Sequence, residues 1–136
     1  MMSETIRILV VDDEDSVRRR CLRLLAREGY DAMGAKTSAA ALEIVQSTSC
    51  DVVLADIRMP GMDGMQLLNH LKEFDPSIEV IMMTGYAAVD TAVRAMKSGA
   101  YDYLTKPVEM DELLHVVRNV AEKKYLQREM ECLRRQ

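Results

Sequence analysis

The chain of 136 residues has no tryptophan and few aromatic residues, histidines and cysteines. Its three cysteines, Cys21, Cys50 and Cys132, are too far apart for a zinc site and do not form a paired disulfide framework, so we expect reduced thiols without a functional role. The two histidines, His70 and His115, stand alone in helical stretches. We therefore assign them no metal or catalytic role.

Long apolar runs and an excess of basic residues are also missing. No apolar run approaches the ~18 residues that cross a bilayer, and the polar stretch from Met1 to Thr5 lacks the layout of a signal peptide. The formal net charge is −4, which argues against a broad surface for nucleic acid. We expect a cytoplasmic chain with one hydrophobic core, without direct membrane or nucleic-acid binding.

Five short strand-like runs alternate with helical patterns. The runs are residues 6–11, 30–35, 52–55, 80–83 and 101–104. The first, third and fourth are almost wholly apolar, which is typical of central strands covered on both faces, whereas the second and fifth look peripheral. The alternation predicts an α/β fold with a doubly wound, five-stranded parallel sheet of flavodoxin-like order 2-1-3-4-5, with five helices and an extended last helix.

Capping and breaking residues predict where the helices start and stop. The expected starts are Asp15 or Ser16, Ser38, Asp63, Asp90 or Thr91, and a point near Glu109 and Asp111. Gly29 and Gly99 are expected to end the first and fourth helices. The last pattern meets no glycine or proline before Gln136, so we expect it to continue to the end of the printed sequence.

Polar side chains follow four of the predicted strands. They are Asp12, Asp13, Asp56, Thr84 and Lys106. The carboxyl ends of parallel strands meet at one edge of a sheet, so we expect these side chains to converge. Three carboxylates in one crevice repel each other unless a cation neutralises them. Because the ligands are oxygens, without thiolate or imidazole, they favour Mg²⁺.

A lysine and a threonine beside such a cation suit a phosphoryl group, since one pairs with an oxyanion and the other donates a hydrogen bond. Asp56 is the best nucleophile because it stands alone at the end of a central strand, whereas adjacent Asp12 and Asp13 are placed to hold the metal. Each residue alone has a simpler interpretation as a cap or turn residue. Their joint occurrence favours an aspartate that accepts phosphate.

Four segments carry a resemblance to a known family. They are ILVVDDE (8–14), DVVLADIRMPGMDG (51–64), VIMMTGYA (80–87) and GAYDYLTKP (99–107). Together they resemble the response-regulator receiver domain of two-component signalling, which has a CheY-like fold. The resemblance covers roughly residues 5 to 122, so we expect a receiver domain over residues 1–122 and a helical extension over residues 123–136.

The resemblance implies a role for each residue of the crevice. Asp56 matches the aspartate that takes a phosphoryl group from a phosphohistidine of a sensor histidine kinase, or from a small phosphodonor. Asp13 and Asp56 match direct Mg²⁺ ligands together with the main-chain carbonyl of Arg58, and Asp12 matches the acid that holds the metal through water. Arg58 and Tyr86 match positions that modulate hydrolysis of the acyl phosphate.

Further matches concern the switch. Thr84 and Lys106 match the switch hydroxyl and the phosphate-binding lysine, and Tyr103 matches the aromatic residue whose ring changes rotamer when Thr84 moves. In this family the Lys106-Pro107 peptide is commonly cis. The resemblance therefore implies a conformational output rather than turnover of a substrate, so the chain is not expected to be an enzyme beyond its own phosphoryl transfer and dephosphorylation.

The motifs are most similar to receivers of the NtrC type, which regulate an attached AAA+ ATPase that activates the nitrogen-type sigma factor form of RNA polymerase. This similarity implies a C-terminal output domain, not included in this chain, for transcription. Leu126, Met130 and Leu133 follow at four- and three-residue steps and suggest a helical seam for a homodimer, although a solvated helical tail fits the same pattern.

Other functions fit the sequence less well. A stand-alone receiver that acts through protein contacts is the main alternative. A Mg²⁺-dependent aspartyl phosphohydrolase of the haloacid-dehalogenase kind would have an acid two residues after its nucleophile, where this chain has Arg58. A flavodoxin-like FMN binder would need glycine-rich phosphate loops and aromatic stacking residues, yet the chain is 4% aromatic.

Overall fold

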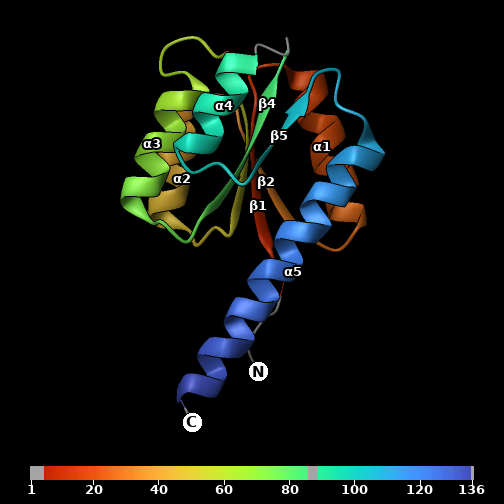
Figure 1. Ribbon diagram of the computed structural model, residues 1–136. Coiled ribbons are helices and arrows are strands. Elements are labelled where there is room, and N and C mark those ends of the chain that lie inside the picture. The colour runs from red at the N-terminus through yellow and green to blue at the C-terminus, as the bar shows by residue number, and fades with distance from the viewer. Residues whose placement is uncertain (1–4, 86–88, 136) are drawn as a thin grey trace.

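The computed structural model describes residues 5–85 and 89–135, over which strands and helices alternate (Figure 1). The strands are β1 (Arg7–Val11), β2 (Asp31–Ala35), β3 (Val52–Asp56), β4 (Glu79–Thr84) and β5 (Asp102–Thr105). The helices are α1 (Asp15–Arg27), α2 (Ser38–Ser47), α3 (Gly64–Phe74), α4 (Val89–Lys97) and α5 (Met110–Arg135).

The strands of these described ranges form one parallel sheet of order β2-β1-β3-β4-β5, which confirms the predicted fold. As their weaker apolar patterns predicted, β2 and β5 lie at the two edges. All strands run toward the top of Figure 1, so their carboxyl ends meet at one edge of the sheet. This is the edge at which doubly wound sheets bind ligands.

Helices cover both faces of the sheet, with α2, α3 and α4 on one side and α1 and α5 on the other (Figure 1). Alternate side chains of β1 enter two separate cores. Leu9 and Val11 pack in the core of α2, α3 and α4, whereas Ile8 and Val10 pack in that of α1 and α5. Because both faces are buried, the central strands show no polar alternation in sequence.

The first two helices begin slightly away from their predicted starts. Glu14 occupies the N-cap position of α1 without a side-chain cap, so neither Asp15 nor Ser16 is the cap. In α2, Thr37 accepts a hydrogen bond from Ala40 N at 3.1 Å, and the prediction of a Ser38 cap was wrong. Two adjacent hydroxyl residues compete for this role, and only the first has the extended backbone of an N-cap.

The remaining boundaries agree more closely with the predictions. Asp63 caps α3 as expected, whereas α4 begins at Val89, so the expected start at Asp90 or Thr91 falls inside the helix. Gly29 and Gly99 have φ angles of 94° and 105°, in the left-handed region that favours glycine after a helix. Both glycines therefore end their helices as predicted.

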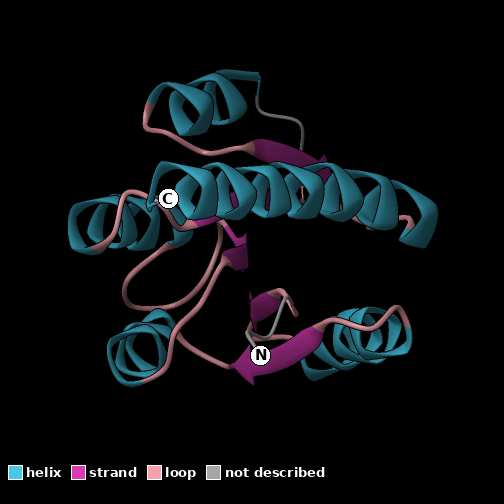
Figure 2. Cartoon of the chain, turned by 90° about the horizontal axis from the view of Figure 1, so that it is seen from below, coloured by secondary structure: helices cyan, strands magenta, loops and turns pink. Residues whose placement is uncertain are grey.

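Helix α5 continues past the predicted domain boundary at residue 122 and contacts the lower edge of the sheet. Figure 2, seen from below, shows it crossing the molecule toward the end marked C. Three of its cations bind polar groups at the amino ends of β3 and β4. The pairs are Lys123 with Glu79 (2.6 Å), Arg128 with Asp51 (2.6 Å), and Lys124 with the main-chain carbonyl of Ser77.

We call these six residues the α5 clasp. Lys124 is buried, with 6% of its surface exposed, so the clasp packs α5 closely against the sheet edge rather than leaving it in solvent. The outward side chains Leu126, Met130 and Leu133 are 54%, 53% and 63% exposed. Within the described ranges, none of the helices combines the length and apolar character required to cross a membrane.

Candidate functional site

Three carboxylates meet where β1 and β3 end. Val11 of β1 pairs with Ala55 of β3, so the next residues, Asp12 and Asp56, lie side by side at the carboxyl edge of the sheet. One carboxylate oxygen each from Asp12, Asp13 and Asp56 lies within 4.8 Å of the other two. The structure therefore brings together the three acids that the sequence places at these strand ends.

Lys106, which follows β5, points its ammonium group into this acidic crevice. Its Nζ lies 2.8 Å from Asp12 Oδ2, 3.0 Å from Asp56 Oδ2 and 3.1 Å from Glu14 Oε1. Its main-chain N–H donates a hydrogen bond to the carbonyl of Thr84 at 2.7 Å, which ties the ends of β4 and β5 together. The lysine is thus held at the crevice by both its backbone and its side chain.

Burial and pairing shift the pKa values of the two central groups. Burial raises the pKa of Asp56 above its ordinary value, although its hydrogen bonds from Lys106 and the main-chain N–H of Arg58 oppose this shift. Burial alone would lower the pKa of Lys106, but its contacts with Asp12 and Asp56 outweigh burial and raise it. The lysine therefore remains a fixed cation at neutral pH.

The oxygen atoms of the crevice fit a hard divalent cation. Two of the three acids also have a fixed orientation, since Asp12 Oδ1 accepts from Glu14 N at 2.9 Å and Asp56 Oδ1 accepts from Arg58 N at 3.1 Å. Two ligands of one Mg²⁺ lie at most about 4.2 Å apart, and one oxygen from each of the three acids lies within 4.8 Å of the others. Asp12 and Asp56 are almost fully buried, at 0% and 4% exposed, and such a concentration of negative charge needs more than one lysine to balance it.

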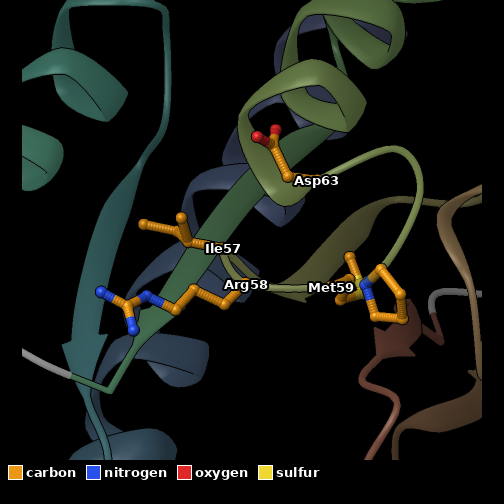
Figure 3. Close-up of a pocket in the computed structure, with 5 residues that line it drawn as sticks. Ile57, Arg58, Met59 and Asp63 are labelled. Atoms are coloured by element: carbon orange, nitrogen blue, oxygen red, sulfur yellow. The ribbon is translucent and has the colours of Figure 1, made fainter.

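The loop after β3 forms an open pocket of about 440 Å³ next to the crevice. It is lined by Ile57, Arg58, Met59, Pro60 and Asp63. Figure 3 shows the Arg58 side chain directed away from Met59, with Asp63 at the start of α3. The pocket gives solvent access to the loop that immediately follows Asp56.

The same loop is closed tightly onto β3. Gly64 N donates to the carbonyl of Ile57 at 2.8 Å, and a Cβ atom on Gly64 would lie only 2.3 Å from the carbonyl oxygen of Asp56. Asp63 accepts a hydrogen bond from Gln66 N at 2.9 Å, and its own N–H donates to Gln66 Oε1 at 3.0 Å. This reciprocal capping box fixes the start of α3 beside the Asp56 backbone.

The remaining predicted site residues lie on β4 and β5. Thr84 ends β4 and is buried, whereas Tyr103 of β5 is 41% exposed. The Lys106-Pro107 peptide is cis, as the resemblance implied. Tyr86, which the sequence matches to a position that modulates hydrolysis, lies outside the described residues.

Two residues of the crevice were missed from the sequence. Glu14 contacts Lys106, and Arg18 of α1 donates through Nη1 to the main-chain carbonyl of Asp12 at 2.8 Å. A signal for Glu14 was available, because it is the third consecutive acid after the first strand. Arg18 stands in a run of three arginines, and local sequence does not distinguish the inward residue from its neighbours.

Comparison with known proteins agrees with this geometry. The family profile of the response regulator receiver domain matches residues 8–118. The regulatory protein AtoC of Escherichia coli K12 is 40% identical over 132 residues, which cover 97% of this chain and 29% of that protein. The DNA-binding transcriptional regulator NtrC of the same strain is 44% identical over 110 residues, which cover 81% of this chain and 24% of that protein.

Solved structures support the same assignment. A response regulator receiver domain protein from Clostridium thermocellum superposes with a TM-score of 0.84 at 36% identity, covering 90% of this chain and 98% of that one. The chain spans less than a third of the length of AtoC and NtrC. Since the family profile extends across all residues of the crevice, the chain belongs to the response regulator receiver domains, in the group related to NtrC-type activators.

Proposed function

We propose that this chain is a phosphorylation-controlled switch in which Asp56 accepts a phosphoryl group in a Mg²⁺-dependent reaction. The observation that carries the proposal is the crevice itself, where Lys106 bridges Asp12 and Asp56, two members of a cluster of three carboxylates. In a purely structural ion pair, one lysine would balance the charge of one acid. Here three carboxylates leave excess negative charge, which a divalent cation can neutralise so that an anionic phosphoryl group can approach Asp56.

The proposed donor is a phosphohistidine of a sensor histidine kinase, or a small phosphodonor. A carboxylate oxygen of Asp56 forms the new bond to phosphorus while the bond between phosphorus and the histidine nitrogen breaks, and the leaving imidazole takes a proton from solvent. Lys106 then pairs with a phosphoryl oxygen in place of Asp56 Oδ2. Bound Mg²⁺, held by Asp13, Asp56 and the main-chain carbonyl of Arg58, and by Asp12 through water, would offset the repulsion between anions.

Phosphorylation with acetyl phosphate tests the acceptor. Intact-mass measurement should show one added phosphoryl group with Mg²⁺ and none with a chelator. Asp56→Asn should abolish the gain, whereas Asp111→Asn, which changes an exposed acid at the start of α5, should leave it unchanged. Equal labelling of the Asp56→Asn protein would place the acceptor elsewhere and refute the proposal.

The metal site has a separate test. Asp13→Ala should weaken Mg²⁺ binding because it removes a ligand, yet it should also relieve repulsion among the three acids. Thermal unfolding without Mg²⁺ should therefore occur at an equal or higher temperature than in the wild type, and stabilisation by added Mg²⁺ should shrink. A large loss of stability without metal would indicate that Asp13 is structural.

We further propose that phosphorylation changes the surface of α4, β5 and α5. Thr84 and Tyr103 would act as the switch, because Thr84 directly follows Met83, the register partner of Asp56, and Tyr103 lies on the adjacent strand β5 opposite Met82. Val93, Met96 and Tyr103 leave apolar surface exposed on this side. A shift of the loop after β4 would bias this face between two packings, which is a shift of population rather than a catalytic turnover. The chain would catalyse only its own phosphorylation and dephosphorylation.

The relatives suggest how such a switch is used. We propose that the receiver domain comprises residues 1–122, that residues 123–136 form a helical extension which is held at its start by the α5 clasp and leads into a linker, and that the output is transcriptional, through an AAA+ ATPase and DNA-binding domain of the NtrC type. Self-association along Leu126, Met130 and Leu133 would carry the signal. Sedimentation should show weaker association for Leu126→Ser/Leu133→Ser than for wild type, with and without beryllofluoride. A wild-type monomer under both conditions would refute the dimer.

A further inference from the structure

Arg18 stands apart from the other arginines of α1. Its side chain is 17% exposed, whereas Arg19 and Arg20, which follow it directly, are exposed. The Arg18 guanidinium is fixed at both ends of its fork, since Nη1 donates to Asp12 O at 2.8 Å and Nη2 donates to Asp15 Oδ1 at 2.6 Å. A planar guanidinium held by two acceptors keeps each of them in a defined orientation.

The contact with Arg18 satisfies the main-chain carbonyl of Asp12. Asp12 N donates to Ala35 O at 3.2 Å, and Asp12 Oδ1 accepts from Glu14 N at 2.9 Å. Within residues 5–85 and 89–135, by contrast, no residue donates a hydrogen bond to the Asp13 carboxylate. The direction of the Asp13 side chain thus depends on the plane of the peptide that joins it to Asp12, and Arg18 holds that plane through the carbonyl.

The sheet provides room for the stem of Arg18. Gly34 lies in edge strand β2, where glycine is an unfavourable choice for strand stability. A Cβ atom at this position would lie 3.0 Å from Leu22 Cδ1 and 3.3 Å from Arg18 Cδ. The missing side chain of Gly34 therefore allows Arg18 to lie against β2 and reach the Asp12 carbonyl.

We propose that Arg18 is a positioning residue for the cation site, which holds the peptide between Asp12 and Asp13 so that the Asp13 carboxylate faces the cation. This inference rests on the proposed Mg²⁺-dependent function and adds a residue that does not itself touch metal or phosphate. It also makes a prediction of opposite sign to simple electrostatics. Removing a nearby positive charge should strengthen cation binding by Coulomb's law, whereas removing a positioning residue should weaken it.

The test compares Mg²⁺ binding by titration calorimetry in the full, unphosphorylated chain. Arg18→Met should weaken binding about tenfold, a loss typical of groups that orient metal ligands. Arg19→Met removes the same charge from an exposed position on α1 and should leave the affinity unchanged or slightly higher. Arg18→Lys keeps the charge but has a single donor nitrogen in place of the fork, so its affinity should lie between those of wild type and Arg18→Met.

Gly34→Ala perturbs the same contact from another element. It should weaken Mg²⁺ binding in the same direction as Arg18→Met while leaving every charge in place, so it keeps the test valid if Arg18→Met folds poorly. Equal or tighter binding by folded Arg18→Met, or wild-type affinity in both Arg18→Lys and Gly34→Ala, would overturn the positioning role. Failure of the wild type to bind Mg²⁺ would instead overturn the proposed function.

Discussion

Replacing Gly64 with alanine tests how closely α3 must approach the strand that carries the acceptor. Gly64 is the first residue of α3, and its N–H donates to the carbonyl of Ile57. Its backbone has no positive φ angle, so a side chain is excluded by space rather than by conformation. The substitution therefore changes one distance next to Asp56 and leaves the chemistry of the crevice intact.

The size of the effect follows from the contacts of the added Cβ atom. It would lie 2.3 Å from Asp56 O and 2.7 Å from Ile57 Cα, both of which are backbone atoms that cannot rotate away. Ordinary contact at about 3.4 Å requires a shift of about 1 Å, and such overpacking costs about 1–3 kcal/mol. Alanine would return at most about 1 kcal/mol through its higher helix propensity. We expect a net loss of about 1–2 kcal/mol.

Function should suffer more than stability. A displacement of about 1 Å at a reacting group can slow a reaction by up to about 100-fold, so phosphorylation by acetyl phosphate should slow between about 10- and 100-fold. Urea unfolding followed by circular dichroism measures stability, because the chain has no tryptophan. Intact-mass measurement at timed intervals gives the phosphorylation rate.

Gly29→Ala is the matched control. Gly29 has a φ of 94° with open space around it, so alanine there costs about 1–2 kcal/mol through backbone strain alone. Gly29 lies between the end of α1 and the start of β2, at the amino ends of the strands, whereas Asp56 lies at a carboxyl end. Alanine at Gly29 should therefore not affect phosphorylation. If Gly64→Ala phosphorylates at the rate of Gly29→Ala at similar stability, close approach of α3 does not position the acceptor.

Three further experiments test the other contacts. Lys124→Met should raise the unfolding temperature near about pH 7, because burial lowers the pKa of Lys124 and disfavours its charged form. In the folded wild type Lys124 loses its proton at lower pH than in the unfolded chain, so the wild type becomes more stable toward about pH 10 and the advantage of Lys124→Met shrinks. Lys97→Met, at an exposed lysine, is the control. An advantage that stays constant with pH would contradict this reasoning. Asp63→Ala should cost about 1 kcal/mol in urea unfolding through loss of the α3 cap, and an unchanged midpoint would show that the capping box is not needed. A double-mutant cycle of Arg128→Gln and Asp51→Asn should give a coupling below about 1 kcal/mol, because the pair is partly exposed, and a larger value would mean that the contact is better shielded from water.

Most of the fold can be predicted from local patterns of apolar and polar residues in the sequence. Residues 52–55 and 80–83 are continuous apolar runs because both faces of β3 and β4 are buried, so their central position could be predicted. The convergence of Asp12, Asp56 and Lys106 also follows once the strands are parallel, since topology alone brings their ends together. Helix starts were less certain, because Thr37 and Ser38 are both good caps and the choice depends on backbone geometry.

Contacts between distant segments could not be predicted in the same way. The spacing of apolar residues along α5 can be read from the sequence, but it does not show which way the basic side chains of the helix point. Lys124 is buried only because α5 crosses the sheet edge near Ser77, and Arg128 meets Asp51 across 77 positions of sequence. Arg18 of α1 poses the same problem, since its inward direction depends on the absence of a side chain at Gly34 of β2.

The uninterrupted course of α5 has a consequence for anything attached behind it. A helix turns about 100° and rises about 1.5 Å per residue, so a module fused to the end of α5 has a defined rotational phase relative to the phosphoacceptor edge. Inserting one residue in the exposed stretch 129–134 would rotate the module by about 100°, whereas inserting seven would return it to within about 20° of its original direction. Since the α5 clasp fixes the helix to the sheet, the receiver sets the angular position of an attached module as well as its distance.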